Sequence, residues 1–509
     1  MKPEKKVLKE QIDTIRIAAS SALDINLKST LGQYYTPASV CLFMSSLFEN
    51  FNTNVSILEP GSGSGSLTLA FISKCVESGS INKIESTTID IENKIAPYLS
   101  ESIKICHSIC DDKNIKFNHY HKNSDFILDA LENDNHYSHV IINPPYKKIN
   151  SKSLHWKALV DMGIKSTNLY SAFILLSLKK LKVNGELVAI IPRSFCNGVY
   201  HREFRKYLIE NTCIKQIHIF NDRKDIFSGE KILQENIIIH LVKGQTQSKI
   251  KISSSQTSDF YFDINHNQYK TKDMTVYETD FHNIVDSCDR ESFIKIAANE
   301  KEQNAIKKIS FFKENLLSLG LKISTGAVVD FRVKDDLTNE TCDDSCALIY
   351  STHLKKTIHW PLKAKKPNAI KISKSSINSL WKNNGSYIIL RRFSPKEEKR
   401  RLVATYYDGS LPGELIGFDN KLNIIHYDKT GIDELIAKGL YVYLNSSVLD
   451  DYYRLFGGNT QVNATDIRHL PFPSIESLKR MGAKMQTLDI TQEQLDNILN
   501  DELIISKLN

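Results

Sequence analysis

The tetrapeptide Asn143-Pro144-Pro145-Tyr146 follows an apolar run over residues 139–142 that favours a buried strand. Neither proline can donate a backbone hydrogen bond, and their fixed φ angles hold nearby carbonyls and the Asn143 side chain around one spot. Asn143 and the Pro144 carbonyl could accept the hydrogens of a planar amino group, and Tyr146 offers a ring face to a flat substrate. The tetrapeptide therefore indicates methyl transfer onto an amide-like or aromatic amino nitrogen, although a plain strand and proline turn would use the same residues.

A glycine-rich turn lies upstream, between an apolar strand-like run over residues 55–58 and a helical pattern that continues to Val76. This arrangement is typical of the first strand, turn and helix of a doubly wound α/β sheet. Glycines at 61, 63 and 65 would let the backbone approach a ligand closely and present N–H groups to it. Their spacing is GxGxG, whereas nicotinamide dinucleotide sites use GxGxxG, so a nicotinamide cofactor is disfavoured. A flexible linker would not lie directly between a buried strand and an amphipathic helix.

Two further acids follow strand-like segments. Asp90 lies near the end of residues 86–91, at a distance from the glycine turn that suits a carboxylate binding ribose hydroxyls. Asp125 and Phe126 lie at the edge of an expected third strand. Each acid taken alone would more often be a solvated loop carboxylate.

In this order, the segments resemble motifs X, I, II, III and IV of the γ-class N6-adenine DNA methyltransferases. The resemblance covers roughly residues 30 to 245 and implies a Rossmann-like class I domain that uses S-adenosylmethionine. The segments that carry it are Gly32-Gln33-Tyr34-Tyr35-Thr36-Pro37, Leu58-Glu59-Pro60-Gly61-Ser62-Gly63, Asp90, Asp125-Phe126 and Asn143-Pro144-Pro145-Tyr146.

The resemblance also implies a role for each residue. The methionine end of the cofactor would lie against Tyr35, Thr36 and Pro37, and its amino group would bind Glu59, beside Pro60, Gly61 and Gly63. Asp90 would bind the ribose, Asp125 the adenine amino group, and Phe126 or Ile91 would pack on the adenine ring. The catalytic residues would be Asn143, which also borders the cofactor, Pro144, Pro145, Tyr146 and Phe227. Phe227 would be a second aromatic face for the target base, although a core phenylalanine would look the same.

The domain layout follows from the same pattern. We expect an N-terminal helical segment over residues 1–30, a catalytic domain over 31–245, a polar connector with short strands over 246–300 and an α+β domain over 301–509. Within the catalytic domain, residues 168–181 favour a helix and residues 186–192 a buried strand. Residues 214–220 and 236–242 favour a terminal antiparallel pair.

The C-terminal region interleaves basic and aromatic residues, a composition that suits phosphate contacts and the reading of base edges. It resembles the target-recognition region of type II modification methylases of the PstI/BsuBI kind. That reading assigns Arg391, Arg392, Asn459, Gln461 and Asn463 to DNA. For any one of them, an ordinary solvated surface or a structural turn explains the sequence equally well.

Composition agrees with this assignment. The chain has 509 residues, a net charge of +7 and nine cysteines without a disulfide framework. It shows no signal-peptide pattern and no apolar run long enough to span a bilayer, so we expect a cytoplasmic protein without a membrane segment. Metal is not expected. The expected partners are double-stranded DNA and a separate restriction endonuclease, and the expected state is a monomer.

The sequence thus predicts a site-specific adenine N6 methyltransferase that acts on double-stranded DNA by base flipping. The same tetrapeptide could serve cytosine N4, an RNA base or a protein glutamine. A different class of protein, a DNA-binding module that has lost catalysis, predicts broken motifs. Glu59, Asp90, Asp125, Asn143 and Tyr146 are all present.

Overall fold

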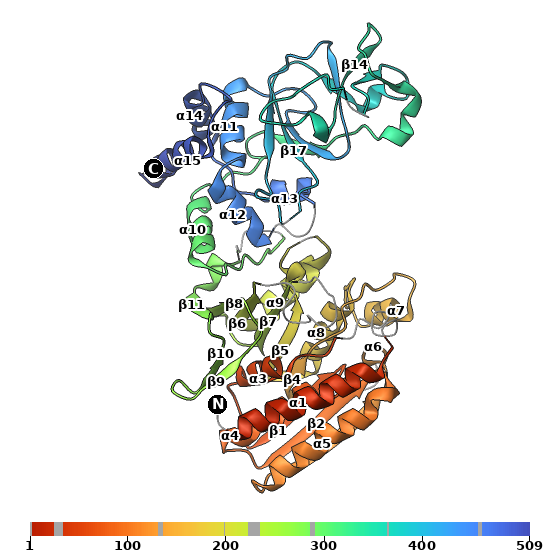
Figure 1. The fold of residues 1–509 in the computed structure, drawn as a ribbon, viewed down its shortest axis with the longest axis vertical. Coiled ribbons are helices and arrows are strands. Elements are labelled where there is room, and N and C mark those ends of the chain that lie inside the picture. The colour runs from red at the N-terminus through yellow and green to blue at the C-terminus, as the bar shows by residue number, and fades with distance from the viewer. Residues whose placement is uncertain are drawn as a thin grey trace. The chain divides into compact units, whose positions relative to one another are not determined.

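The computed structural model divides the chain into two compact units, Met1–Asn299 and Glu300–Asn509, and each is considered by itself (Figure 1). The residues that the structure describes are 3–24, 34–130, 136–197, 199–221, 235–285, 291–363, 366–395, 397–456 and 461–508. Within these ranges, none of the helices combines the length and the apolar character needed to cross a bilayer.

Unit 1 is built on a nine-stranded sheet of order β11-β8-β6-β7-β5-β4-β1-β2-β3. From β3 to β5 the strands run parallel, and β7 then pairs antiparallel with both β5 and β6. The Rossmann-like α/β architecture expected from the sequence is confirmed, including the antiparallel pair. The main strands are β1 (Asn54–Pro60), β2 (Lys83–Asp90), β3 (Lys116–Asn123), β4 (Tyr137–Ile142), β5 (Leu181–Pro192), β6 (Thr212–Phe220) and β7 (Asn236–Lys243).

Helices cover both faces of this sheet, because its central strands alternate their apolar side chains between two cores. Ile141 belongs to one core and its neighbours Val140 and Ile142 to the other. The first core is covered by α1 (Pro3–Ala22), α3 (Ala38–Ser46), α4 (Ser66–Ser78) and α5 (Ala96–Asp111). The second includes residues of α6 (Phe126–Asp129), α7 (Leu154–Asp161), α8 (Leu169–Lys180) and α9 (Arg202–Asn211).

The N-terminal helix α1 is fixed to α4, Phe262 and the start of α3 by polar contacts and by a cation–ring contact. Lys5 Nζ lies 2.9 Å from Glu77 Oε2 and 3.6 Å from the centre of the Phe262 ring. Farther along α1, Asp13 Oδ1 accepts a hydrogen bond of 3.2 Å from the backbone N–H of Ala38 at the start of α3. The helix therefore supports the segment that leads into α3.

The segment expected as a connector contributes to unit 1. Strands β8 (Ile250–Ser255) and β11 (Thr275–Thr279) extend the large sheet, and β9 (Tyr261–Asp263) pairs with β10 (Gln268–Lys270). The serines of β8 are buried, but they have hydrogen-bond partners: Ser253 and Ser255 lie 2.9 and 3.1 Å from the two ring nitrogens of His218. A polar sequence here forms an interior strand because its hydroxyls are satisfied.

Unit 2 combines two mainly antiparallel sheets with helices, an α+β organisation. A four-stranded sheet has the order β12-β20-β17-β18, and a five-stranded sheet the order β13-β15-β14-β19-β16. The strands of the four-stranded sheet are β12 (Lys322–Thr325), β17 (Tyr387–Arg391), β18 (Ala404–Tyr407) and β20 (Leu422–His426). Those of the other are β13 (Leu337–Thr338), β14 (Ser345–Ile349), β15 (Ala369–Lys371), β16 (Leu380–Lys382) and β19 (Leu415–Phe418). The helices are α10 (Glu300–Ile309), α11 (Glu434–Leu444), α12 (Ser447–Phe456), α13 (Ala464–Arg468), α14 (Ile475–Lys484) and α15 (Gln492–Leu508).

Candidate active site

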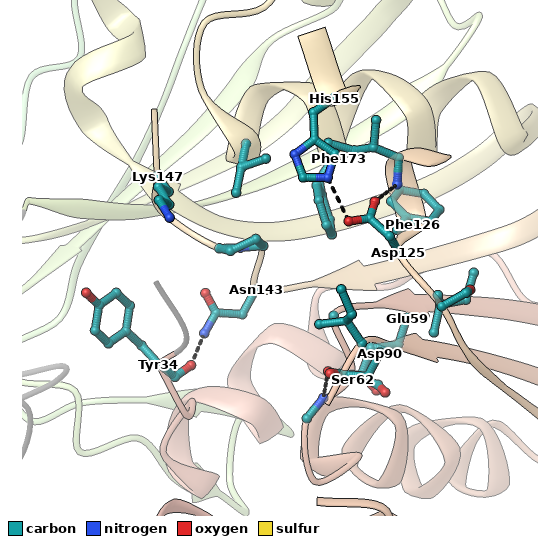
Figure 2. A pocket seen from close by; sticks show the side chains of 18 of the residues that line it. Tyr34, Glu59, Ser62, Asp90, Asp125, Phe126, Asn143, Lys147, His155 and Phe173 are labelled. Atoms are coloured by element: carbon teal, nitrogen blue, oxygen red, sulfur yellow. Dashed lines mark hydrogen bonds and ion pairs between the residues drawn. The ribbon is translucent and has the colours of Figure 1, made fainter. Parts of the chain in front are cut away.

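A pocket of about 330 Å³ opens at the carboxyl ends of the central strands of unit 1 (Figure 2). Glu59 lies near the end of β1, Asp90 at the end of β2, and Asn143 directly after β4. Side chains that follow neighbouring parallel strands meet at one edge of a sheet, which is where ligands bind in open α/β folds. The sequence-predicted residues are thus brought to a single cavity.

The glycine turn forms one wall of this pocket. Gly61, Gly63 and Gly65 have φ angles of 71°, 52° and 74°, which strain any residue with a Cβ atom. The N–H of Gly61 donates to the Ile89 carbonyl at 2.7 Å, and that of Gly63 to Asp90 Oδ2 at 2.8 Å. The Gly65 N–H donates to the Ser62 carbonyl. The expectation that these amides point at a ligand is therefore wrong. The glycines shape the wall, the N–H groups of Gly61 and Gly63 hold the turn onto β2, and the Gly65 N–H closes the turn itself.

Glu59 is buried beside the first turn of α4. Its Oε2 accepts a 2.9 Å hydrogen bond from the Thr68 N–H and a second from the Thr68 hydroxyl. Burial raises the pKa of Glu59 from 4.5 to about 8, despite the opposing effect of the hydrogen bonds from Thr68. A cationic group entering the pocket would favour the ionised carboxylate.

Asp90 is a second buried carboxylate, held between two backbone amides. Gly63 N–H donates to one oxygen at 2.8 Å and Glu92 N–H to the other at 2.9 Å. Burial raises the pKa of Asp90 above its usual 3.8, although both amides oppose that shift. Beside it, the apolar side chain of Ile91 lines the pocket while Ile91 remains 53% exposed, an arrangement suited to packing against a flat ring.

Asp125 begins the short helix α6 and forms an ion pair that the sequence does not reveal. Its Oδ1 accepts hydrogen bonds from the N–H groups of Ile127 and Leu128, and its Oδ2 lies 2.7 Å from His155 Nε2 (Figure 2). The hydrogen bond that His155 donates to Asp125 raises the pKa of His155. Burial opposes ionisation of Asp125, but the contact with His155 and the two amides outweigh it, so the pKa of Asp125 is lowered.

The Asn143 side chain is oriented by contacts on both sides of its amide. Its Nδ2 donates to the Tyr34 carbonyl at 2.7 Å and to Thr36 Oγ1 at 3.0 Å. The Tyr146 hydroxyl lies 3.0 Å from both Asn143 Oδ1 and the Ile190 carbonyl, and its single proton can serve one of them at a time. An amide oxygen has two lone pairs, so Asn143 Oδ1 can accept from a second donor.

Several pocket residues were not anticipated. Among the described residues, the buried hydroxyl oxygens of Ser62 and Ser124 line the cavity and have no hydrogen-bond partner. Tyr34 supplies both a carbonyl to Asn143 and part of the wall, while Phe173 and His155 reach the pocket from α8 and α7. Ser62 and Tyr34 lie inside segments that carry the family resemblance, so both had a recognisable signal. His155 is distant in sequence and had none.

The whole chain matches known proteins. A family model described as the Eco57I restriction-modification methylase matches residues 34–227. The type II methyltransferase M.PstI of Providencia stuartii is 40% identical over 501 residues, which cover 97% of this chain and 96% of that protein. M.BsuBI of Bacillus subtilis is 39% identical over 507 residues, covering 97% and 98%. The chain belongs to the type II restriction-modification methyltransferases.

A more distant likeness comes from a solved structure, the type IIL restriction-modification enzyme MmeI in complex with DNA. It aligns with 99% of this type II methyltransferase and 72% of its own chain, at 10% identity and a TM-score of 0.49. The resemblance to methylases of the PstI/BsuBI kind is confirmed by the two full-length relatives.

Within this type II methyltransferase, most of the predicted cofactor residues share the pocket. Pro37 instead precedes α3, Pro60 ends β1, and Pro144 and Tyr146 lie beside the pocket without lining it. The Tyr146 ring packs at 5.8 Å from that of Tyr34. Phe227 lies outside the described residues. The predicted residues that line the pocket are Tyr35, Thr36, Glu59, Gly61, Gly63, Asp90, Ile91, Asp125, Phe126, Asn143 and Pro145.

The residues predicted to contact DNA gather in unit 2. An Arg391 guanidinium nitrogen lies 3.8 Å from Glu398, and Arg392 Nη1 lies 3.4 Å from the Asn420 carbonyl. Gln461 pairs with Phe393 in an isolated bridge. Asn463 forms a capping box with Asp466 at the start of α13, which gives it a structural role, and Asn459 lies outside the described residues.

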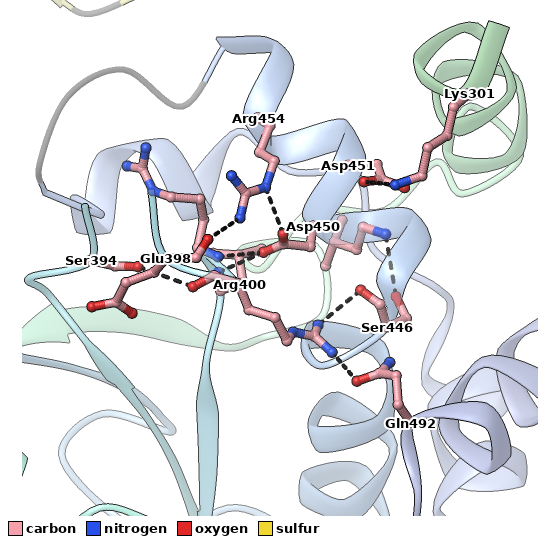
Figure 3. Close-up of polar contacts among 12 residues, drawn as sticks. Lys301, Ser394, Glu398, Arg400, Ser446, Asp450, Asp451, Arg454 and Gln492 are labelled. Atoms are coloured by element: carbon pink, nitrogen blue, oxygen red, sulfur yellow. Dashed lines mark hydrogen bonds and ion pairs between the residues drawn. The ribbon is translucent and has the colours of Figure 1, made fainter. Parts of the chain in front are cut away.

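Arg400 and Arg401, two further basic residues of the C-terminal region, make interior contacts. Arg401 is buried and its N–H donates to Asp450 Oδ1 at 2.7 Å. An Arg400 nitrogen donates to the Ser446 carbonyl at 3.0 Å, and another contacts Gln492 (Figure 3). These contacts hold the segment before β18 against the helices of unit 2.

Proposed function

We propose that this type II methyltransferase transfers a methyl group from S-adenosylmethionine to adenine N6 in double-stranded DNA, after flipping the adenine out of the duplex. The observation that carries the proposal is the meeting of Asn143 with Glu59, Asp90 and Asp125 in one pocket. By this modification the enzyme would protect DNA from a separate restriction endonuclease that reads the same sequence.

The pocket residues fit the cofactor chemically. Glu59 suits its ammonium group, Asp90 its ribose hydroxyls and Asp125 its adenine amino group, because a carboxylate accepts hydrogen bonds from each. The hydroxyls of Ser62 and Ser124, buried without partners among the described residues, offer further polar contacts to a ligand. When bound, the cofactor supplies a methyl group already activated on a sulfonium.

Asn143 and the Pro144 carbonyl would act on the target amino group. By accepting hydrogen bonds from the amino group, they draw the nitrogen lone pair out of conjugation with the ring and toward the methyl group. Tyr34 and Thr36 fix the Asn143 amide so that Oδ1 is its acceptor atom. The remaining contribution is positioning, since holding two reactants in line supplies a large part of many enzymatic rate enhancements.

Base flipping would present the adenine to Asn143. Extrusion costs on the order of a few kcal/mol, which stacking on Tyr146 and hydrogen bonds to the base edge would offset. The Tyr146 ring is held by its hydroxyl contacts and by the rings of Tyr34 and Tyr170. Arg391, Arg392, Gln461 and, outside the described residues, Asn459 are the proposed DNA contacts of unit 2. Asn463 would reach DNA only if its capping amide were released.

The test is incubation of the purified chain with labelled S-adenosylmethionine and unmethylated bacterial genomic DNA, followed by nucleoside digestion and mass spectrometry. N6-methyladenine is the expected product, and sequencing the modified sites would give the specificity. N4-methylcytosine would retain the mechanism and change the base. Absence of label in DNA would contradict the proposal and favour an RNA or protein amino group.

A further inference from the structure

Three segments of unit 2 meet at one end of its four-stranded sheet. There β12 leads into residues 326–332, β17 ends at Arg391 and leads into residues 392–393, and β20 begins just after Lys421. Asn420 N–H donates to the Val328 carbonyl at 2.9 Å, and Arg392 N–H to the Lys421 carbonyl at 3.0 Å. These bonds join the segments into one surface, called here the strand-end face: Phe331, Arg332, Arg391, Arg392, Phe393 and Lys421.

Two phenylalanines project from this face. Phe331 is 78% exposed and Phe393 is 52% exposed, although burial of a phenyl ring would stabilise the folded protein. The Arg332 guanidinium lies 5.6 Å from the centre of the Phe331 ring. An exposed aromatic ring beside a guanidinium group is suited to stacking on a nucleic acid base while the cation contacts phosphate.

The charge of the face is positive. Arg332 and Lys421 are exposed, and Arg391 and Arg392 are half-buried. Three acids lie near these cations among the described residues. Asp330 forms an ion pair with Lys366, Glu398 lies 3.8 Å from Arg391, and Asp419 is buried and accepts a hydrogen bond from the Lys421 N–H. The excess of cations complements a polyanion, and the exposed rings distinguish this face from an ordinary solvated lysine and arginine surface.

The loop that carries Phe393 is anchored. It leaves β17 and returns to β18, and at its base Asp450 accepts hydrogen bonds from the N–H groups of Arg401 and Leu402. Arg454 links Asp450 Oδ2 to the Glu398 carbonyl with hydrogen bonds of 2.8 Å each (Figure 3). A fixed base reduces the ordering cost that the loop would otherwise incur on binding.

We propose that the strand-end face binds the DNA duplex and that Phe331 contacts base pairs there, by stacking on a base or by inserting as a wedge between two neighbouring base pairs. This inference rests on the proposed function and extends it, because neither Phe331 nor Arg332 nor Lys421 was among the residues assigned to DNA. Apolar wedges of this kind unstack a base step and widen the surface that the protein can contact.

The experiment measures DNA binding by the full chain using fluorescence anisotropy. One labelled duplex carries the site mapped by the methylation assay, and a second carries that site scrambled. Phe331→Ala is expected to raise the Kd for the mapped duplex about tenfold, the effect of losing one aromatic stack. Arg332→Ala should weaken binding to both duplexes, and it should reduce by about one the salt slope, the slope of the logarithm of the binding constant against the logarithm of the salt concentration.

Matched controls come from the opposite end of the same strands. Leu317 precedes β12 and is 79% exposed, so Leu317→Ala removes an equally exposed apolar group. Lys322 pairs with Asp428 at that end, so Lys322→Ala removes a surface charge. Both controls should bind each duplex as the unsubstituted chain does, and all four variants should keep the melting temperature and the cofactor Kd.

Two results would overturn the inference alone while methylation of DNA by the unsubstituted chain continued. One is unchanged affinity for both duplexes in Phe331→Ala and Arg332→Ala. The other is a change in oligomeric state instead of DNA affinity, which would make the face a contact between two copies. If the unsubstituted chain neither bound nor methylated DNA, the proposed function would fail together with this extension of it.

Discussion

At the scale of single residues, Asn143 is the side chain whose removal should separate binding from chemistry. Asn143→Ala removes the acceptor proposed for the target amino group, so methyl transfer should fall by about a hundredfold to a thousandfold. Cofactor binding should persist, because the three pocket carboxylates remain. Single-turnover transfer and calorimetric cofactor binding, measured on the same preparation, would check both halves.

A matched control for that variant is Asn150→Ala, since Asn150 also lines the pocket but is exposed. It should leave the rate of transfer within a few-fold of the unsubstituted enzyme. Retention of full activity by Asn143→Ala would remove Asn143 from its assigned role.

Glu59 should make cofactor binding depend on pH. Burial raises its pKa to about 8 in the ligand-free chain, so below that pH the carboxyl is mostly protonated and cannot pair with an ammonium group. The affinity for S-adenosylmethionine should therefore rise as pH increases toward about 8. It should fall again at higher pH, because the amino group of the cofactor, with an ordinary pKa of about 7.7–8.0, then loses its proton. Because binding releases one proton, the cofactor Kd can change by at most about tenfold per pH unit.

The Glu59→Gln variant should bind the cofactor weakly, and its affinity should not rise with pH. His155 also has a raised pKa and lies in the pocket, so the titration should be repeated with His155→Gln to separate the two groups. A flat pH profile for the chain that retains Glu59 would argue against an ionisable carboxyl at the cofactor's amino group.

At the scale of helices and strands, the crossing of α11 and α14 depends on two glycines. A Cβ at Gly439 would collide with the Leu478 carbonyl, and one at Gly482 with the Leu435 carbonyl. Gly439→Ala should therefore force the helices apart and lower the free energy of unfolding of unit 2 by about 1–3 kcal/mol. Denaturant unfolding would measure the loss.

The neighbouring Lys438→Ala variant is the control, because Lys438 is partly exposed and pairs with Glu434 along the helix. Its effect should stay within about 0.5 kcal/mol. Gly439→Ala should also leave the cofactor Kd unchanged, because the pocket lies in unit 1. Equal stability of the two variants would contradict the close helix crossing.

The elements that local patterns specify were predicted well from the sequence, and those that depend on distant partners were not. Strand, glycine turn and helix follow one another around Gly61, so the first βα unit could be placed from periodicity and from the need for positive φ. By contrast, β8 is rich in serine, and its burial depends on His218, which belongs to a different strand. No local pattern predicts such a partner.

The same distinction holds within the site. Glu59 and Asp90 lie at the ends of strands and Asn143 directly follows one, so topology alone brings them together. His155 lies on α7 and contacts Asp125 at the start of α6. Arg401 is buried because Asp450 and the helices of unit 2 surround its segment. In composition alone, Arg401 and the exposed Arg332 look alike. Burial separates a structural arginine from one that can bind phosphate.

At the scale of the whole molecule, the division into two units predicts that cofactor and DNA binding can be disturbed independently. Asp90→Ala removes the carboxylate proposed for the ribose and should raise the cofactor Kd about tenfold or more, with the DNA Kd unchanged. Replacing Arg391 and Arg392 together with alanine should weaken DNA binding and reduce its salt slope by about two, with the cofactor Kd unchanged.

Combining the three substitutions provides the decisive measurement. Asp90 lies in one compact unit and the Arg391–Arg392 pair in the other. The effect of Asp90→Ala on the free energy of the transition state and the effect of replacing both arginines should therefore add within about 0.5 kcal/mol. Glu85→Ala, an exposed acid on the same strand as Asp90, controls for loss of negative charge. Transfer rates at limiting cofactor and limiting DNA, compared across the single, double and triple variants, would give the coupling. A coupling energy well above that limit would mean that the two binding events communicate, and that a rearrangement between DNA binding and methyl transfer has to be included in the mechanism.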